Sequence, residues 1–503
     1  MLKRTIERFL KKNGLDFSVK ETEEFGDYFV FLPSLAEEIF QKLSLKKPSF
    51  LKEIELKPPG FLNFYFDENF LKKKFFWIIK NPKKFFEINL GKRKKVEVEF
   101  VSANPTGPLT LGNIRGGPFG DSLSNLLKMV GYRVKKVYYV NDCGKQIIEL
   151  GKTILGEGEF YKGSYIKDLK KEISGKDPEK VGKKAARIIL RKLILPTLKK
   201  LGIKYDKLFF ESRLFKESWT KKAISLLQKR KLLYQKDGAT WLDGKKIGLN
   251  KDFVLIKSDG KMTYLATDIA FHLYKFKKEK YYFVVDIFGA DHLDESKALK
   301  ATIETLGFKG KLKILLLQFV TLIQKGKMEK MSKREGRYVL ADEILDKIGK
   351  DVLRYFFLEK SLSSHLNFDL DFIQKRTFEN PYFYLQYAYV RILSILKRGK
   401  VTKFPRLSLK DVKSLNHPSE INLLKNLLKY PEVIEKGAND FEMHKILKYA
   451  QKIASLFHSF YQECQVIQEK ENLFKARVAL IYFAKEILEK LFWIMGITPL
   501  SKM

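Results

Sequence analysis

Cysteine is nearly absent from this sequence. Only Cys143 and Cys464 occur among its 503 residues, and no Cys-x-x-Cys pair of the kind used by zinc-binding and redox motifs is present. The six histidines are scattered in the same way. The sequence therefore excludes a disulfide-stapled domain and a zinc finger, and we expect no structural metal.

Long apolar runs are missing as well. No stretch approaches the roughly 18 uncharged apolar residues that a membrane-spanning helix needs. The N-terminal residues Met-Leu-Lys-Arg-Thr-Ile-Glu lack the apolar region of a secretory signal peptide. We expect a soluble, cytoplasmic protein that makes no membrane contact.

Acidic residues are few relative to basic ones. The chain has 97 Lys and Arg against 59 Asp and Glu, a formal net charge of +38. So large a positive charge favours a polyanionic partner, with nucleic acid as the leading candidate. Lysine enrichment from genome composition, or a solvated heat-tolerant surface, would explain the composition equally well. Charge thus supports nucleic-acid binding without establishing it.

Three regions differ in their patterns of apolar residues. Residues 1–90 indicate a small α+β unit, in which a Pro-Pro-Gly turn precedes an alternating strand at 61–66. Residues 91–365 contain alternating strands and helices. Residues 366–503 show only helical periodicity, which predicts an all-α bundle. We expect three domains with these boundaries.

The middle region begins with a strand at 96–100, where apolar residues alternate with glutamates. Two prolines and a glycine at 102–108 exclude a helix or a regular ladder there. Apolar residues at helical spacing follow and end at Gly131, and 137–140 predicts a second strand. This order predicts an α/β fold, a Rossmann-type doubly wound parallel sheet, in which ligands bind at the carboxyl ends of the strands.

Later strands are predicted at 282–286 and 313–317. A helix-rich, strongly basic stretch from about 155 to 245 separates them from the first two. We therefore expect a helical insertion that divides the sheet into two halves.

Two segments carry the pattern of a nucleotide site. Lys330-Met-Ser-Lys333 lies between glycines, and two lysines three residues apart can address the phosphates of one nucleotide. Alone, such a pair in so lysine-rich a chain is better explained by a solvated loop. The second segment, Pro108 to Arg115, lies between a strand and a helix, where glycine permits close approach and the helix N-terminus favours anions.

Together the two segments resemble the paired signatures of class I aminoacyl-tRNA synthetases. The first signature reads Thr110-Leu-Gly-Asn113 here, so both histidines of the family pattern are replaced. Threonine and asparagine can each donate a hydrogen bond to phosphate oxygens, which preserves the function in kind. The resemblance implies catalytic roles for Thr110, Asn113, Lys330 and Lys333. It implies ATP contacts for Pro108, Leu111, Gly112, Gly289, Asp291, His292, Met331 and Ser332.

Further blocks narrow the resemblance to the arginyl-tRNA synthetase family. In order, the blocks that resemble this family are residues 99–108, 138–144, 257–270, 288–292, 351–357, 366–371 and 380–388. The family resemblance implies an arginine site formed by Glu99, Ser102, Asn104, Tyr264 and Asp268. A guanidinium group needs carboxylates, and Tyr264 and Asp268 would share one helical face. The bland alternative is a packing tyrosine and a helix-capping aspartate.

By the same resemblance, the protein activates L-arginine with ATP and transfers it to the 3′ end of tRNA(Arg). Mg²⁺ should accompany the ATP, the N-terminal domain should contact the corner of the tRNA, and the helical bundle should bind the anticodon. We expect a monomer. Two alternatives remain open: a catalytically silent tRNA-binding paralogue, suggested by the missing histidines, and a class I ligase of other amino acid specificity. Asn141, Asp142 and Gln146 are weaker site candidates because such residues often cap helices.

Overall fold

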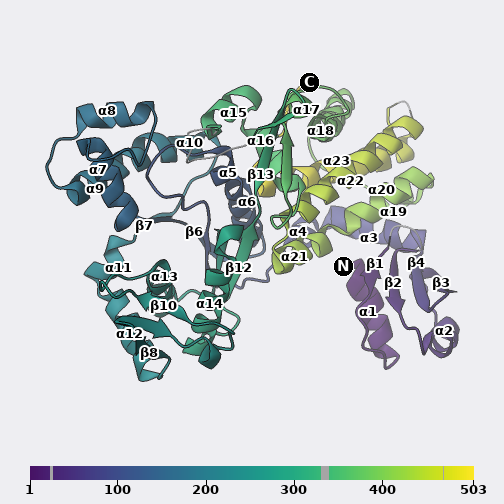
Figure 1. Cartoon of the computed structure of the whole chain (residues 1–503). Helices are drawn as coiled ribbons and strands as arrows, with labels where there is room; N and C mark the ends of the chain where they lie inside the picture. Colours follow the sequence, from purple (N-terminus) through teal and green to yellow (C-terminus); the bar gives the residue numbers. More distant parts are fainter. Residues whose placement is uncertain (23–25, 330–338, 468) are drawn as a thin grey trace.

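The computed structural model describes residues 1–22, 26–329, 339–467 and 469–503 (Figure 1). Its N-terminal unit is a four-stranded antiparallel sheet of order β1-β2-β4-β3 with helices packed beside it. Its elements are α1 (Leu2–Lys12), β1 (Lys20–Glu21), β2 (Tyr28–Phe31), α2 (Ala36–Leu45), β3 (Leu51–Lys57), β4 (Phe61–Phe66), α3 (Glu68–Lys80) and α4 (Pro82–Phe86). The strand predicted at 61–66 is confirmed.

The centre of the molecule is a five-stranded parallel sheet of order β12-β11-β5-β6-β7. The strands are β5 (Lys95–Glu99), β6 (Arg133–Val140), β7 (Lys207–Phe210), β11 (Phe283–Gly289) and β12 (Leu312–Leu317). The chain winds from β5 outward through β6 and β7, and then returns to β11 on the other side of β5. The strand order therefore reverses between β5 and β11, which is where ligands bind in sheets of this kind.

Helices fill the connections between these strands. The first crossover uses α5 (Leu111–Ile114) and α6 (Gly116–Met129). The connection from β6 to β7 contains α7 (Lys145–Leu155), α8 (Ser164–Glu172), α9 (Pro178–Ile189), η1 (Leu190–Ile194) and α10 (Leu195–Lys200). The last crossover uses η4 (Ala290–His292), α14 (Leu293–Ile303) and η5 (Glu304–Phe308).

The expectation of a helical insertion from about 155 to 245 needs correction, because β7 lies inside that range and forms the edge of the main sheet. This strand has four residues, and its Phe209 packs against Phe271 with ring centroids 4.3 Å apart. After β7 come α11 (Ser212–Lys216), α12 (Trp219–Lys229), β8 (Leu233–Lys236), β9 (Ala239–Leu242), η2 (Lys245–Ile247), β10 (Phe253–Ile256), α13 (Tyr264–Leu273) and η3 (Tyr274–Lys278). Strands β8 to β10 form a separate antiparallel sheet.

A small three-stranded sheet joins the central sheet to the C-terminal helices. It contains β13 (Val320–Gln324), β14 (Lys327–Glu329) and β15 (Leu366–Asp369), with α15 (Ala341–Ile348) and α16 (Lys350–Glu359) between them in sequence. Strand β15 corrects the expectation that the chain is wholly helical from 366. Leu366 and Phe368 are buried while Asn367 is exposed, so these residues alternate as a strand and pair with β13.

The rest of the described chain is helical, as predicted. The helices are α17 (Leu370–Ile373), α18 (Pro381–Arg398), α19 (Leu409–Lys413), α20 (Pro418–Leu428), α21 (Tyr430–Asp440), α22 (Met443–Glu463) and α23 (Glu471–Met495). Phe457 and Phe460 are fully buried in this bundle. Among the helices of the described ranges, none is long and apolar enough to cross a membrane.

The N-terminal unit is docked onto the helical bundle. The Tyr28 hydroxyl donates to Glu432 Oε2 at 2.5 Å, and Lys429 Nζ pairs with Glu21 Oε1 at 2.5 Å. Beneath these polar contacts, the rings of Phe75 and Phe483 lie 5.6 Å apart. Polar and apolar contacts together hold the two units in one arrangement.

Arg354 joins three parts of the fold. Its guanidinium group is fully buried and donates to Asp121 Oδ2 on α6 at 2.7 Å, to the Met495 carbonyl of α23 at 2.8 Å and to the Leu201 carbonyl at 3.2 Å. Asp121 is also paired with Lys136 at 2.8 Å. Removing one partner of a buried, hydrogen-bonded charge pair is strongly destabilising, because the remaining groups stay buried without a donor.

We predict that Arg354→Met lowers the free energy of unfolding by about 3 kcal/mol. The lower end of the usual range applies because Lys136 still neutralises Asp121. Urea titration followed by circular dichroism measures the change, and Arg376→Met at an exposed position is the matched control. Equal midpoints for the two variants would contradict the prediction.

Candidate active site at the carboxyl edge of the sheet

Thr110 and Asn113 are bonded to each other at the start of α5. The Thr110 hydroxyl donates to Asn113 Oδ1 at 2.9 Å, the Thr110 amide donates to the same oxygen at 3.2 Å, and the Asn113 amide donates to Thr110 Oγ1 at 3.3 Å. This reciprocal arrangement is a capping box. The two residues therefore fix the beginning of the helix, with Gly112 between them, at the end of the sheet where anions are favoured.

The loop between β5 and α5 is held in an unusual backbone conformation. Val101 and Ser102 have φ of 67° and 37°, in the left-handed region that costs a non-glycine residue about 1–3 kcal/mol. Side chains from other elements support it: Tyr138 donates to the Ala103 carbonyl at 2.6 Å and Tyr165 donates to the Thr106 carbonyl at 2.8 Å. The loop is thus preformed by its surroundings.

Glu99 is the last residue of β5, and it is buried. Its Oε1 accepts from the Ser102 hydroxyl at 3.1 Å, and its Oε2 accepts from Lys275 Nζ at 2.7 Å. Burial raises the pKa of Glu99 to about 7; Lys275 opposes this shift, and Asp286 adds to it. The strand ends in a carboxylate that is short of positive charge.

Tyr264 and Asp268 lie four residues apart on α13, as predicted. Burial raises the pKa of Asp268 well above its ordinary value, and the negative charges of Glu99, Glu211 and Asp286 raise it further. Tyr264 is about half exposed, with 51% of its surface accessible. Carboxylates that resist ionisation in the empty site gain most from a ligand that brings positive charge. The arrangement suits a cation with several N–H donors.

Ser102 and Asn104 follow Glu99 in the preformed loop. Ser102 Oγ also accepts from the Tyr139 amide at 3.0 Å, so the hydroxyl bridges β5 and β6. Asn104 Nδ2 donates to Gln146 Oε1 at 2.7 Å. Asp142 accepts from the Ser212 amide and hydroxyl at 2.8 and 2.7 Å. Asp142 therefore ties the end of β6 to the start of α11 and does not cap α7, the next helix in the sequence.

Gly289, Asp291 and His292 lie where β11 passes into η4, next to β5 at the same sheet edge. A Cβ atom on Gly289 would lie 2.3 Å from Asp291 Oδ1, so a larger residue here would require the exposed Asp291 side chain to move. His292 Nδ1 lies 3.0 Å from Glu295 Oε2. Asp291 and His292 are exposed, unlike the buried acidic group of Glu99. These two residues lie on the surface at the edge of the sheet and not among its buried residues.

Lys330, Met331, Ser332 and Lys333 lie outside the described residues. The described chain that follows them is bonded to the first signature: the Leu111 amide donates to the Val339 carbonyl at 3.1 Å, and the Ala341 amide donates to the Leu109 carbonyl at 2.9 Å. The return of the chain at 339–341 therefore lies beside Pro108, Leu111 and Gly112. These hydrogen bonds join two segments about 230 residues apart in sequence, which no local pattern could predict.

Three charged groups of this site were not predicted from the sequence. Lys275 contacts Glu97, Glu99 and Asp286; His272 contacts Asp286; and Glu211 follows β7. Burial raises the pKa of Glu211 to about 7, and Asp142 raises it further. One signal was available: β5 carries two glutamates, and a central strand of a doubly wound sheet is covered on both faces.

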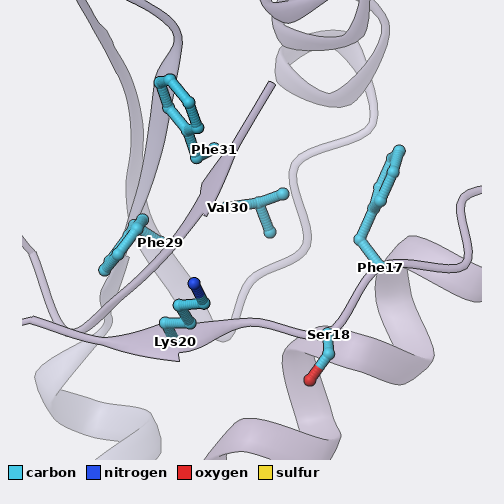
Figure 2. A pocket seen from close by; sticks show the side chains of 6 residues that line it. All are labelled: Phe17, Ser18, Lys20, Phe29, Val30 and Phe31. Atoms are coloured by element: carbon cyan, nitrogen blue, oxygen red, sulfur yellow. The ribbon is translucent and has the colours of Figure 1, made fainter. Parts of the chain in front are cut away.

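A separate aromatic pocket lies on the N-terminal unit (Figure 2). Phe31 is 46% exposed there, and its ring centroid lies 4.7 Å from that of Phe61. The lining residues are Phe17, Ser18, Lys20, Phe29, Val30 and Phe31. Exposed rings beside a lysine are suited to stacking an unpaired base. The pocket belongs to a different part of the molecule from the acidic site (Figure 1).

Two family models match this chain. Residues 77–361 match the family model described as tRNA synthetases class I (R), catalytic domain, and residues 385–503 match the DALR anticodon binding domain. The arginine–tRNA ligase of Carboxydothermus hydrogenoformans is 36% identical, with 91% of this chain and 87% of the relative covered. That of Caldanaerobacter subterraneus subsp. tengcongensis is 37% identical, with 93% and 88% covered.

A solved structure shares the fold. The arginyl-tRNA synthetase of Thermus thermophilus superposes with a TM-score of 0.80 and covers 100% of both chains at 21% identity. At that identity the likeness shows the fold alone.

We predict that Thr110→Ala lowers the free energy of unfolding by about 1 kcal/mol, because the Asn113 amide loses its capping acceptor. Thr110→Ser keeps the hydroxyl and should retain most of this free energy. Parallel urea titrations of the two variants measure the difference. A Thr110→Ala protein as stable as Thr110→Ser would show that the capping box contributes nothing.

Proposed function

This chain belongs to the arginine–tRNA ligase family of class I aminoacyl-tRNA synthetases, and we propose that it joins arginine to tRNA(Arg) with Glu99 and Asp268 holding the guanidinium group. One observation carries the assignment of these residues. Glu99 is buried at the end of β5, at the switch point of the sheet, and Asp268 lies on α13; burial raises the pKa of both, and the charge of Glu99 raises that of Asp268 further.

The reaction needs positioning rather than a nucleophilic side chain. The carboxylate of arginine attacks the α-phosphorus of ATP, and pyrophosphate leaves. A hydroxyl of the terminal tRNA ribose then attacks the carbonyl carbon of the adenylate, and AMP leaves. No covalent enzyme intermediate forms, so the protein contributes orientation and hydrogen-bond donors for charge that builds on phosphate oxygens.

Arginine would enter between β5 and α13. Its guanidinium group would meet Glu99 and Asp268, with Tyr264 at the rim and Ser102 and Asn104 near the α-amino group. Two carboxylates on different elements match the forked N–H donors of a guanidinium group, which a lysine ammonium group cannot reproduce. This geometry supports arginine over the other amino acids of the class.

ATP would lie along the edge between α5 and η4. We assign Pro108, Leu111 and Gly112 to one side of the nucleotide, and Gly289, Asp291 and His292 to the other. Thr110 and Asn113 would lie at the helix N-terminus, where the Thr110 hydroxyl would exchange its bond to Asn113 for one to a phosphate oxygen. Lys330 and Lys333 would address the phosphates, with Met331 and Ser332 beside them. The hydrogen bonds of residues 339–341 to residues 109–111 support this pairing of signatures.

Mg²⁺ would arrive bound to the phosphates of ATP, because this ion keeps much of its water and needs few protein ligands. Within the described ranges, one group of three carboxylates has the spacing of a metal site, formed by Glu97, Glu99 and Asp286. It does not fit a magnesium ion, because Lys275 Nζ contacts all three residues. We therefore assign no protein ligand to magnesium.

The tRNA would contact two further surfaces. In the helical bundle, the Arg391 guanidinium group stacks 5.1 Å from the Tyr461 ring and 5.1 Å from the Tyr387 ring, and the exposed Phe378 lies against Tyr387. Such a group suits unpaired anticodon bases. The aromatic pocket of Figure 2 suits a base at the corner of the tRNA. We further propose a monomeric, cytoplasmic enzyme, and light scattering tests the monomer.

The deciding experiment is charging of purified tRNA(Arg) with radiolabelled amino acids and ATP. Arginyl-tRNA should accumulate, with no product from lysine, glutamine or glutamate. Salt-sensitive tRNA binding without charging would instead identify a catalytically silent paralogue. Charging with a different amino acid would overturn the arginine assignment.

We predict that Asp268→Asn raises the KM for arginine by about 10- to 100-fold, because it removes a charge-assisted hydrogen bond to the guanidinium group. The KM for ATP should change little. Steady-state charging measures both constants, and Asp259→Asn, an exposed aspartate of the same region, is the control. An unchanged arginine KM would remove Asp268 from the site.

We predict that the KM for arginine falls as the pH rises from 6 to 8. In the free enzyme the pKa of Glu99 is raised to about 7 and that of Asp268 is raised as well, first of all by burial. Below pH 7 protons therefore compete with arginine for these carboxylates, and above it the ionised site binds more tightly. Charging assays across this range test the prediction; a flat profile would contradict it.

A further inference from the structure

Lys275 lies between the carboxylates of Glu97, Glu99 and Asp286, although the proposed reaction does not use it. Its side chain is fully buried, and its Nζ lies 2.7 Å from Glu99 Oε2, 3.0 Å from Asp286 Oδ1 and 3.1 Å from Glu97 Oε1. Glu99 and Asp286 are register partners on the adjacent strands β5 and β11. Like charges at paired positions repel, so a cation between them is needed for both to ionise.

A hydrogen-bonded chain connects Lys275 to Asp268. Asp286 Oδ2 contacts His272 Nε2 at 2.6 Å, and His272 Nδ1 contacts the Asp268 carbonyl at 2.8 Å. A carbonyl can only accept, so Nδ1 must donate to it. Lys275 and His272 outweigh burial and lower the pKa of Asp286. The two ring nitrogens of His272 thus link this carboxylate to the backbone of α13.

These residues share one face of a continuous helical segment. Asp268, His272 and Lys275 follow one another at four and three residues, which places them in a row. The segment changes from α13 to the π-helical turn η3 at Tyr274, immediately before Lys275. π-helical turns are frequent at functional sites because they redirect side chains.

We propose that Lys275 is a positioning residue for arginine recognition: its ammonium group holds Glu99 directly, and it holds the Asp268 turn of α13 through Asp286 and His272. The inference rests on the proposed function. One oxygen of Glu99 is held by Ser102 and the other by Lys275, so the carboxylate has a fixed direction. Without Lys275, the carboxylates of Glu97, Glu99 and Asp286 would lose the ammonium group that contacts all three.

The test compares Lys275→Met with Lys277→Met, an exposed lysine on the same helical segment. Lys275→Met should raise the arginine KM by about 10- to 100-fold and change the ATP KM by no more than about twofold. Lys277→Met should keep the wild-type KM values for both substrates. The pH at which the arginine KM falls should move upward by at least about one unit, because Glu99 loses its nearest cation. The groups facing Glu99 that set this pH are Lys275, Asp286, Glu97, Asp268, Tyr139 and Tyr205.

A double variant separates positioning from folding. Lys275→Met combined with Glu97→Gln removes one buried negative charge together with the positive one, and circular dichroism checks that it folds. If the double variant keeps the raised arginine KM, Lys275 acts on the site. If its arginine KM and pH profile return to wild-type values, Lys275 only balances charge and the inference is overturned.

The two proposals fail differently. Wild-type enzyme that does not charge tRNA with arginine would overturn the proposed function and this inference with it. Wild-type charging combined with an unchanged arginine KM and pH profile in Lys275→Met would overturn the role of Lys275 alone.

Discussion

Carboxylates on adjacent strands are buried side by side in this fold, and the site depends on how their repulsion is balanced. Glu99 and Asp286 are paired on the adjacent strands β5 and β11, and Glu97 lies two residues before Glu99 on β5. Lys275 supplies positive charge from the helical segment of α13 and η3, and His272 of the same segment contacts Asp286. Balance is incomplete, since the pKa values of Glu99 and Asp268 remain raised, largely by burial. We propose that a guanidinium group satisfies the remaining deficit of positive charge.

The placement of the site follows from the order of the strands. Because β5 is central and the chain reverses direction beside it, the loops after β5 and β11 open at one edge. The capping box of Thr110 and Asn113 begins α5 there, and residues 339–341 return to the same loop. Segments that carry weak signals separately become informative where the sheet brings them together.

The sequence predicted strands near 96–100, 137–140, 282–286 and 313–317, because their apolar runs are long enough to show a period. It missed β7, whose four residues were hidden between helical stretches. From the sequence, the alternation of Glu97 and Glu99 with apolar residues indicated only a strand, because the period of one strand does not show whether both of its faces are covered. Lys275 was one lysine among many, and only its three carboxylate contacts distinguish it.

The attachment of the N-terminal unit to the helical bundle has a consequence for size selection. Two polar pairs, Tyr28 with Glu432 and Lys429 with Glu21, link the unit that carries the aromatic pocket to the helices that carry Arg391 and Tyr461. With the proposed tRNA contacts on both units, this attachment holds the two contact surfaces at a fixed distance from each other. A nucleic acid would then be selected by the distance between its corner and its anticodon as well as by its bases.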